Sequence, residues 1–202
     1  MSMEAWRGNV FEPSNAKSLP KNLKEAPNIQ VIPEYIFGYK TKDTRNNLKY
    51  LSNNTIAYHA GTIVIIQDLT TNSQKLFVKH KEEIQAFAVS KQSKLVAAGD
   101  INKNKSNNKP AIIVWNYENE EEVVSIDSLT NKGFIVIAFN PAGNLLACVT
   151  ADDEHSIFVI ELNNEKREIS NEKAGKNKVL DVSFRTEKVV KIKFSRNSQQ
   201  WV

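Results

Sequence analysis

The chain has 202 residues, a hydrophobic content of 41% and a formal net charge of +4 at pH 7. It is therefore long enough for a packed core, and its mild positive charge suits an acidic partner surface without requiring one. Its apolar runs, such as 62–66 and 133–139, are far shorter than the ~20 residues of a membrane helix, and no secretory signal opens the sequence, so we expect a cytoplasmic protein with no membrane partner.

Residues 1–32 are expected to form an extended N-terminal arm. Pro13, Pro20 and Pro27 exclude a long helix and favour extended backbone. The apolar side chains of Trp6 and Phe11 would be costly to leave in water, so docking of the arm on a partner competes with disorder.

Residues 33–47 form a hydrophobic motif. Tyr35, Ile36, Phe37 and Tyr39 surround a single glycine, Gly38, and the chain then turns sharply polar. Aromatic side chains bury large apolar areas, and tyrosine keeps a polar group at its tip. We therefore expect a structural plug that fills a gap between sheets.

From residue 48 to residue 202 the apolar pattern has a period of two or is continuously β-branched, in short runs separated by Asn, Ser, Lys and Gly. The predicted strands are Leu48–Leu51, Thr55–His59, Thr62–Asp68 and Lys75–His80; Ile84–Ser90, Lys94–Gly99, Ala111–Tyr117 and Glu122–Ile126; Phe134–Asn140, Asn144–Thr150, Ser156–Leu162 and Lys166–Ile169; and Val179–Phe184 and Val189–Phe194. Cys148, the single cysteine, lies in one of these apolar runs and is expected to be a small buried side chain, which excludes an intrachain disulfide.

The strand pattern repeats along the chain. Residues 89–97 and 139–147, about fifty residues apart, share the order strand, polar turn, apolar strand. A four-stranded unit that recurs every 40 to 50 residues is typical of the blades of a β-propeller. The chain provides about three and a half such blades.

These repeats resemble WD repeats. Trp115-Asn116 stands at the place of the Trp-Asp pair, and Lys79-His80 at the place of the Gly-His pair. The stretch 34–48 resembles the hydrophobic motif and first strand of the echinoderm microtubule-associated protein-like family, in which this motif leads into a WD propeller. The resemblance extends over about residues 33–184 and implies an all-β, partial WD-repeat β-propeller, with His80 and Trp115 as structural residues of a blade.

A closed propeller needs at least four blades, because ring closure is what hides the strand edges. We therefore expect that the sequence is a fragment whose missing C-terminal part completes the ring, or that a second chain does so.

The resemblance also implies a function. It indicates a non-enzymatic microtubule-associated scaffold of the cytoskeleton, in the ciliary axoneme, with tubulin and neighbouring microtubule-associated proteins as partners. The alternative left open is a general WD-repeat interaction scaffold of another assembly, without tubulin contact.

Few residues suggest catalysis. Asp152, Asp153, Glu154 and His155 form the one dense acidic cluster with a histidine, but they fall between two predicted strands, where polar residues turn the chain. His59 has no ligand-type residue at metal-binding spacing. Since phosphate-binding loops and hydrolase or metalloprotease motifs are also missing from the sequence, we expect no enzyme, cofactor or metal site.

Three segments are candidates for partner binding. They are the positive insertion with Lys103, Lys105 and Lys109, the basic segment with Lys176, Lys178, Lys191 and Lys193, and the arm with Trp6 and Phe11. The aromatic residues of the blades lie within strands and do not alternate with arginine on one face, so nucleic acid is not an expected partner. The acidic run Glu118–Glu122 is expected to be a solvated hairpin.

Overall fold

The computed structural model describes residues 32–42, 44–102, 107–127, 129–162, 168–177, 179–184 and 190–194. By its internal contacts the chain divides into two units, Met1–Ile32 and Pro33–Val202, and the following description concerns the second. Its described residues form strands and their connections and include no helix, and so none that could cross a membrane.

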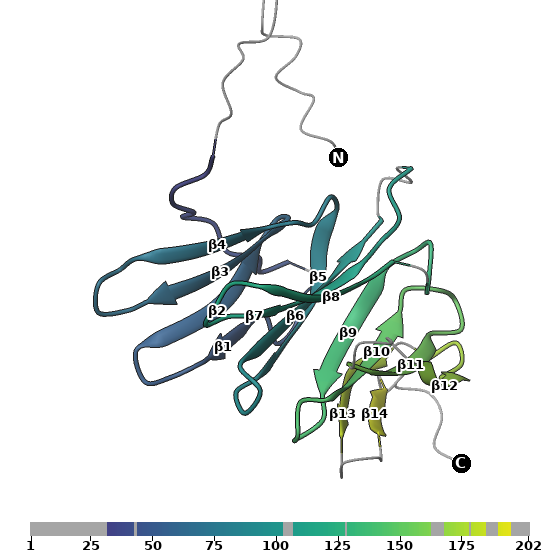
Figure 1. The fold of residues 1–202 in the computed structure, drawn as a ribbon. Helices are drawn as coiled ribbons and strands as arrows, with labels where there is room; N and C mark the ends of the chain where they lie inside the picture. Colours follow the sequence, from purple (N-terminus) through teal and green to yellow (C-terminus); the bar gives the residue numbers. More distant parts are fainter. Residues whose placement is uncertain are drawn as a thin grey trace, which may run out of the picture. The chain divides into compact units, whose positions relative to one another are not determined.

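The strands are β1 (Leu48–Tyr50), β2 (Thr55–Ala60), β3 (Ile63–Asp68), β4 (Gln74–Val78), β5 (Glu83–Ser90), β6 (Leu95–Ile101), β7 (Ile112–Asn116), β8 (Glu122–Ile126), β9 (Phe134–Phe139), β10 (Leu145–Thr150), β11 (Ser156–Glu161), β12 (Glu168–Lys173), β13 (Val179–Phe184) and β14 (Val190–Phe194). Neighbours in sequence pair antiparallel, giving the sheets β1-β2-β3-β4, β5-β6-β7-β8, β9-β10-β11-β12 and β13-β14 (Figure 1). The predicted all-β fold, a partial WD-like propeller, is confirmed. Within the described residues the sheets do not close into a ring.

Tight turns explain why consecutive strands pair. Between β2 and β3 the chain reverses in two residues, and Gly61 takes a φ of 58° that costs glycine little. Between β9 and β10 the side chain of Asn140 accepts the N–H of Leu145 at 2.9 Å, and the carbonyl of Asn140 accepts the N–H of Gly143 at 3.0 Å. Such side-chain bonds replace strand pairing where the chain turns.

Each central strand serves two cores at once. Along β6, Val96 and Ala98 pack in the core between the first and second sheets, whereas Leu95 and Ala97 pack in the core between the second and third sheets. Successive side chains of a strand point to opposite faces, so a sheet buried on both faces needs a continuous apolar run. Cys148 of β10 is fully buried in the second of these cores, as predicted.

One predicted strand is displaced. The sequence pattern places the fourth strand of the third sheet at Lys166–Ile169, whereas β12 spans Glu168–Lys173 and pairs with β11. Its last four residues, Ser-Asn-Glu-Lys, carry no apolar signal. Strand pairing by the backbone defines this outer strand, and the side chains contribute little to the pattern.

The second and third sheets are joined near Gly133. Its backbone, with a φ of 108°, forms an isolated bridge with Ile101, and its carbonyl accepts the N–H of Ala151 at 2.8 Å. A Cβ atom at Gly133 would lie 2.4 Å from the Cα of Ile101, so only glycine fits this contact.

Candidate interaction surface

The hydrophobic motif lies on the face of the first sheet that points away from the second. Ala57 packs toward the second sheet, so its neighbour Tyr58 points to the opposite face. There the ring of Tyr39 meets the ring of Tyr58 edge to face, with the centroids 6.0 Å apart. The hydroxyl of Tyr35 donates to Oδ1 of Asn72 at 3.0 Å. Residues 35–39 of the motif therefore lie on one face of the first sheet.

A glutamine of β4 holds the backbone of the motif. The N–H of Ile36 donates to Oε1 of Gln74 at 2.8 Å, and Nε2 of Gln74 donates to the carbonyl of Ile36 at 3.0 Å. The same amide nitrogen donates to the hydroxyl of Tyr58 at 3.0 Å. This reciprocal pair replaces the two bonds that a neighbouring strand would make. The sequence pattern assigns no role to Gln74.

The structure differs from the expected plug at Phe37. The side chain of Phe37 is 93% exposed, although its ring centroid lies 4.7 Å from that of Tyr35. Gly38 is also exposed, and Tyr39 remains 46% exposed. An extended segment that lies on one sheet can bury only the side that faces the sheet, so among the described residues the outer side has no cover.

The end of the motif is fastened to its surroundings. The N–H of Lys40 donates to the carbonyl of His59 at 3.2 Å, and the ammonium of Lys40 forms an ion pair with Glu83 at the start of β5. The buried Asn47 accepts the hydroxyl of Tyr39 at 2.7 Å and donates to the carbonyl of Lys40. The motif thus contacts both the first and the second sheet.

His80 and Trp115 lie together in the core between these sheets. Their rings meet edge to face with the centroids 5.5 Å apart, and Trp115 also lies 5.5 Å from the ring of Phe77. Nδ1 of His80 donates to Oδ2 of Asp100 at 3.0 Å, while Oδ1 of Asp100 accepts the N–H of Ala111 at 2.7 Å. The arrangement is a buried polar network that links the segment before β5 to β6 and β7.

His59 is a second buried histidine. Its side chain is fully buried, its ring lies 5.7 Å from that of Phe87, and neither ring nitrogen has a hydrogen-bond partner. Burial, assisted by the charge of Lys40, lowers the pKa of His59 to about 4. The imidazole is therefore neutral at pH 7.

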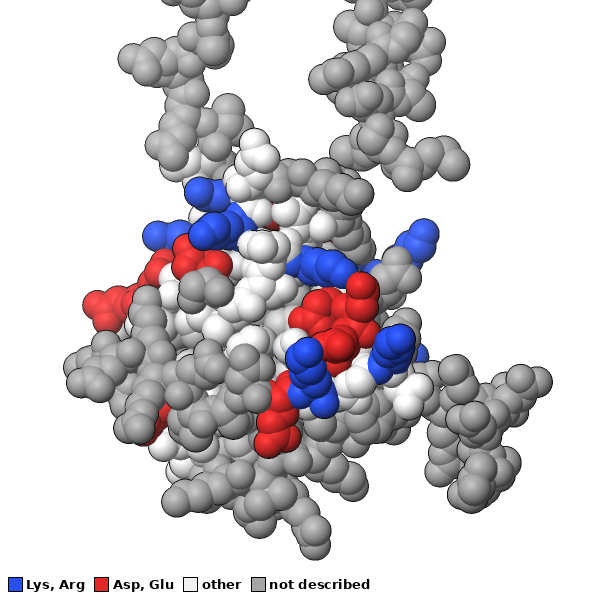
Figure 2. Space-filling view, turned by 90° about the vertical axis from the view of Figure 1, so that its right-hand side faces the viewer, with Lys and Arg blue, Asp and Glu red and all other residues white. Residues whose placement is uncertain are grey.

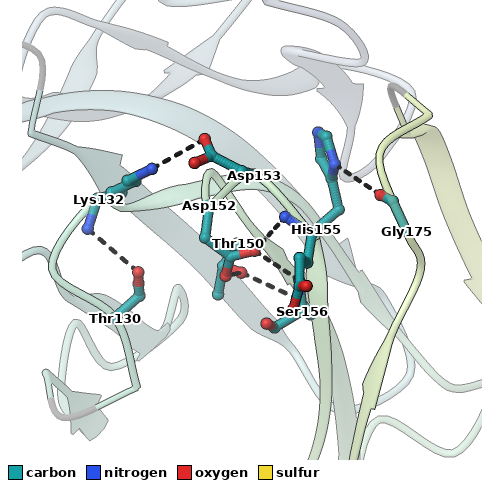
Figure 3. Close-up of polar contacts among 9 residues, drawn as sticks. Thr130, Lys132, Thr150, Asp152, Asp153, His155, Ser156 and Gly175 are labelled. Atoms are coloured by element: carbon teal, nitrogen blue, oxygen red, sulfur yellow. Dashed lines mark hydrogen bonds and ion pairs between the residues drawn. The ribbon is translucent and has the colours of Figure 1, made fainter.

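The acidic cluster that suggested a site in the sequence forms the turn between β10 and β11 (Figure 3). Oδ1 of Asp152 accepts the N–H groups of Glu154 and Ser156, both at 3.1 Å, and Oδ2 accepts the hydroxyl of Thr150. Burial raises the pKa of Asp152, but these hydrogen bonds outweigh it and hold the pKa below its usual value. The ionised carboxylate of Asp152 therefore serves as a hydrogen-bond acceptor that stabilises the turn.

The remaining residues of this cluster pair with neighbours. Asp153 forms an ion pair with Lys132 at 2.9 Å, and Nδ1 of His155 donates to the carbonyl of Gly175 at 3.2 Å. Among the described residues, no group of three or more His, Cys, Asp and Glu side chains could hold a metal ion.

Two of the lysines predicted to bind a partner can be placed. Lys109 and Lys176 are both exposed. The other candidates lie outside the described residues: Trp6, Phe11, Lys103, Lys105 and Lys178, and the side chains of Lys191 and Lys193, whose backbone belongs to β14.

The acidic hairpin between β7 and β8 is paired with lysines. Glu118 contacts Lys94 at 3.1 Å, and Glu120 reaches across to Lys75 of the first sheet at 2.8 Å. Exposed pairs of this kind add little stability, but they neutralise much of the basic charge nearby. Figure 2 shows the same mixture, with acidic side chains gathered beside lysine or arginine on one face.

Comparison with known proteins shows which proteins this chain is similar to. The family model described as the HELP motif matches residues 26–65. Over 179 residues the chain is 24% identical to the 77 kDa echinoderm microtubule-associated protein of Strongylocentrotus purpuratus, a match that covers 86% of this chain and 26% of the relative. It is 20% identical over 202 residues to the ciliary WD repeat-containing protein ctxp80 of Euplotoides octocarinatus, which covers 91% of this chain and 27% of the relative.

A third relative is echinoderm microtubule-associated protein-like 2 of Rattus norvegicus, 23% identical over 172 residues that cover 79% of this chain and 25% of the relative. The chain therefore spans about a quarter of the length of these relatives. Their names describe microtubule-associated and WD-repeat proteins. The chain is therefore similar to the echinoderm microtubule-associated proteins and their relatives, with a HELP-motif match that leads into the first of its WD-type sheets.

Proposed function

We propose that the chain is part of a non-enzymatic, microtubule-associated scaffold of the cytoskeleton, located in the ciliary axoneme. The observation that carries this proposal is the HELP motif that runs directly into WD-type sheets, in a chain whose relatives are named as microtubule-associated proteins and as a ciliary WD-repeat protein. Its mechanism is rigid presentation. The motif braces the first sheet, and basic segments meet the acidic partner surface.

The basic candidates for this contact are Lys103, Lys105 and Lys109 in the insertion and Lys176, Lys178, Lys191 and Lys193 near the C-terminus. The arm, through Trp6 and Phe11, is proposed to dock on a neighbouring protein. A second chain, or a further part of a longer polypeptide, completes the ring of sheets.

The mixed charge of the described surface favours a second candidate, a WD-repeat scaffold without tubulin contact. Co-sedimentation of the chain with microtubules distinguishes the two. The variant Lys176→Glu/Lys178→Glu/Lys191→Glu/Lys193→Glu should lose most of its pelleting. Equal pelleting of both proteins would reject this contact, and no pelleting of either would favour the second candidate.

A further inference from the structure

The inner strands of the sheets enclose a hollow of about 350 Å³. Its walls come from residues 86–89 of β5, 135–139 of β9 and 180–183 of β13, together with Lys49 of β1 and with Arg45 and Asn46 from the segment before β1. Each of these strands lies at the edge of its sheet, so one row of its N–H and C=O groups has no strand to pair with.

We propose that this hollow binds an extended acidic peptide, whose carboxylates are received by Arg45 and Lys49. The proposal goes beyond microtubule association, because it concerns a different surface and requires no microtubule.

Arg45 and Lys49 are the cations that line the hollow. Six other described lysines are engaged in ion pairs: Lys40 with Glu83, Lys75 with Glu120, Lys79 with Glu122, Lys94 with Glu118, Lys132 with Asp153 and Lys173 with Glu154. The described lysines that form no ion pair with another described residue, Lys42, Lys81, Lys91, Lys109 and Lys176, do not line it. Arg45 and Lys49 have no ion-pair partner among the described residues, and both line the hollow. An arginine receives a carboxylate through two parallel hydrogen bonds, which gives direction as well as attraction.

The remaining polar groups favour a peptide over a phosphate polymer. β13 supplies Asp181 and Ser183 to the wall, and Oδ1 of Asp181 accepts the N–H of Val182 at 3.0 Å. A carboxylate in the wall disfavours a polyphosphate, which offers it only anionic oxygens and no hydrogen-bond donor. A peptide instead carries N–H donors between its acidic side chains, and these can be accepted by Asp181 and by the carbonyls of the strand edges.

The test uses the full chain and a fluorescein-labelled poly-glutamate peptide, with binding measured by fluorescence anisotropy at about 0.15 M salt, where the Debye length is about 8 Å. We expect Arg45→Glu/Lys49→Glu to weaken binding by about 10-fold, because the two side chains that receive the carboxylates then repel them. The matched control is Lys81→Glu/Lys91→Glu, which changes the net charge equally at two exposed positions that do not line the hollow. It should alter the affinity by less than ~2-fold, as expected for long-range, screened charges.

Equal losses in the two variants would show attraction by net charge alone and would overturn the proposal, as would failure of the unaltered chain to bind the peptide. Inorganic polyphosphate is the second probe and should bind more weakly than poly-glutamate. Tighter binding of polyphosphate would identify a phosphate site and reject the peptide. Unchanged thermal melting of both variants ensures that a loss reflects binding.

Discussion

Nδ1 of His80 lies 3.0 Å from Oδ2 of Asp100, and this hydrogen bond connects the segment before β5 to the end of β6 inside the core. The carboxylate of Asp100 also accepts the N–H of Ala111, so a single side chain satisfies two buried donors. The His80 ring in turn packs against Trp115. Removal of the carboxylate should therefore affect the whole blade.

Asp100→Ala should lower the free energy of unfolding by about 3 kcal/mol, because it leaves buried donors at His80 and Ala111 without acceptors. Urea denaturation measures the change. Asp127→Ala, at an exposed position, serves as the control and should change the stability by less than ~0.5 kcal/mol. Similar values for the two variants would mean that the buried network contributes nothing beyond a surface aspartate.

The contact at Gly133 makes a second prediction. Gly133→Ala forces a Cβ atom to within 2.6 Å of the carbonyl oxygen of Asp100, at a φ of 108°. We expect a loss of at least ~3 kcal/mol, as for an overpacked and strained site. Gly61→Ala, with a φ of 58° and no atom within 4 Å of the new Cβ, should lose only ~1 kcal/mol from backbone strain. Thermal melting that ranks the two variants in the opposite order would contradict the proposed junction of the second and third sheets.

The burial of His59 is expected to make the free energy of unfolding depend on pH. Its pKa is 6.5 in an ordinary environment and about 4 in the folded chain, so the unfolded chain binds the proton more tightly. The contribution of the neutral imidazole is complete above pH 6.5 and is lost as the pH falls toward 4, by up to ~1.4 kcal/mol per pH unit. His59→Leu should remove this part of the slope in urea denaturation at a series of pH values. An unchanged slope would assign the pH dependence to other groups.

The side-chain amide of Gln74 is expected to hold the backbone of the motif against the first sheet. Gln74→Ala removes both bonds to the backbone of Ile36 and the bond to Tyr58, and should speed hydrogen exchange at the N–H of Ile36. Phe37→Ala is the control, because a side chain that is 93% exposed should matter little to the folded chain. Faster exchange in the Phe37 variant than in the Gln74 variant would show that aromatic packing, and not the amide, holds the motif.

The fold could be predicted from the sequence because each central strand is buried on both faces. Val96 and Ala97 face different cores, and so produce a continuous apolar run that is easily recognised. The sequence pattern does not predict the bounds of β12 correctly, because this strand is defined by backbone pairing and its polar residues, such as Ser170 and Lys173, form no apolar run. The recurrence of these apolar runs about every fifty residues predicts the four-stranded blades of a propeller.

The polar contacts could be predicted only in part. His80 and Trp115 are rare residue types at repeat positions, whereas Asp100 and Gln74 are common residues whose partners come from other strands. A polar residue directly after the apolar run 95–99 is the one signal that could have marked Asp100. The exposure of the Phe37 side chain depends on which residues pack against the outer side of the motif. The sequence pattern of the motif itself does not contain that information.

We propose above that the chain, with its HELP motif and WD-type sheets, associates with microtubules. The most direct measurement is co-sedimentation of the unaltered chain with microtubules across a salt series, with its mass in solution recorded alongside. Because basic segments are proposed to meet an acidic surface, we predict pelleting that is strong at low salt and declines steeply as salt increases. A monodisperse chain that stays in the supernatant at low salt, or one that pellets equally at all salt concentrations, would contradict the account.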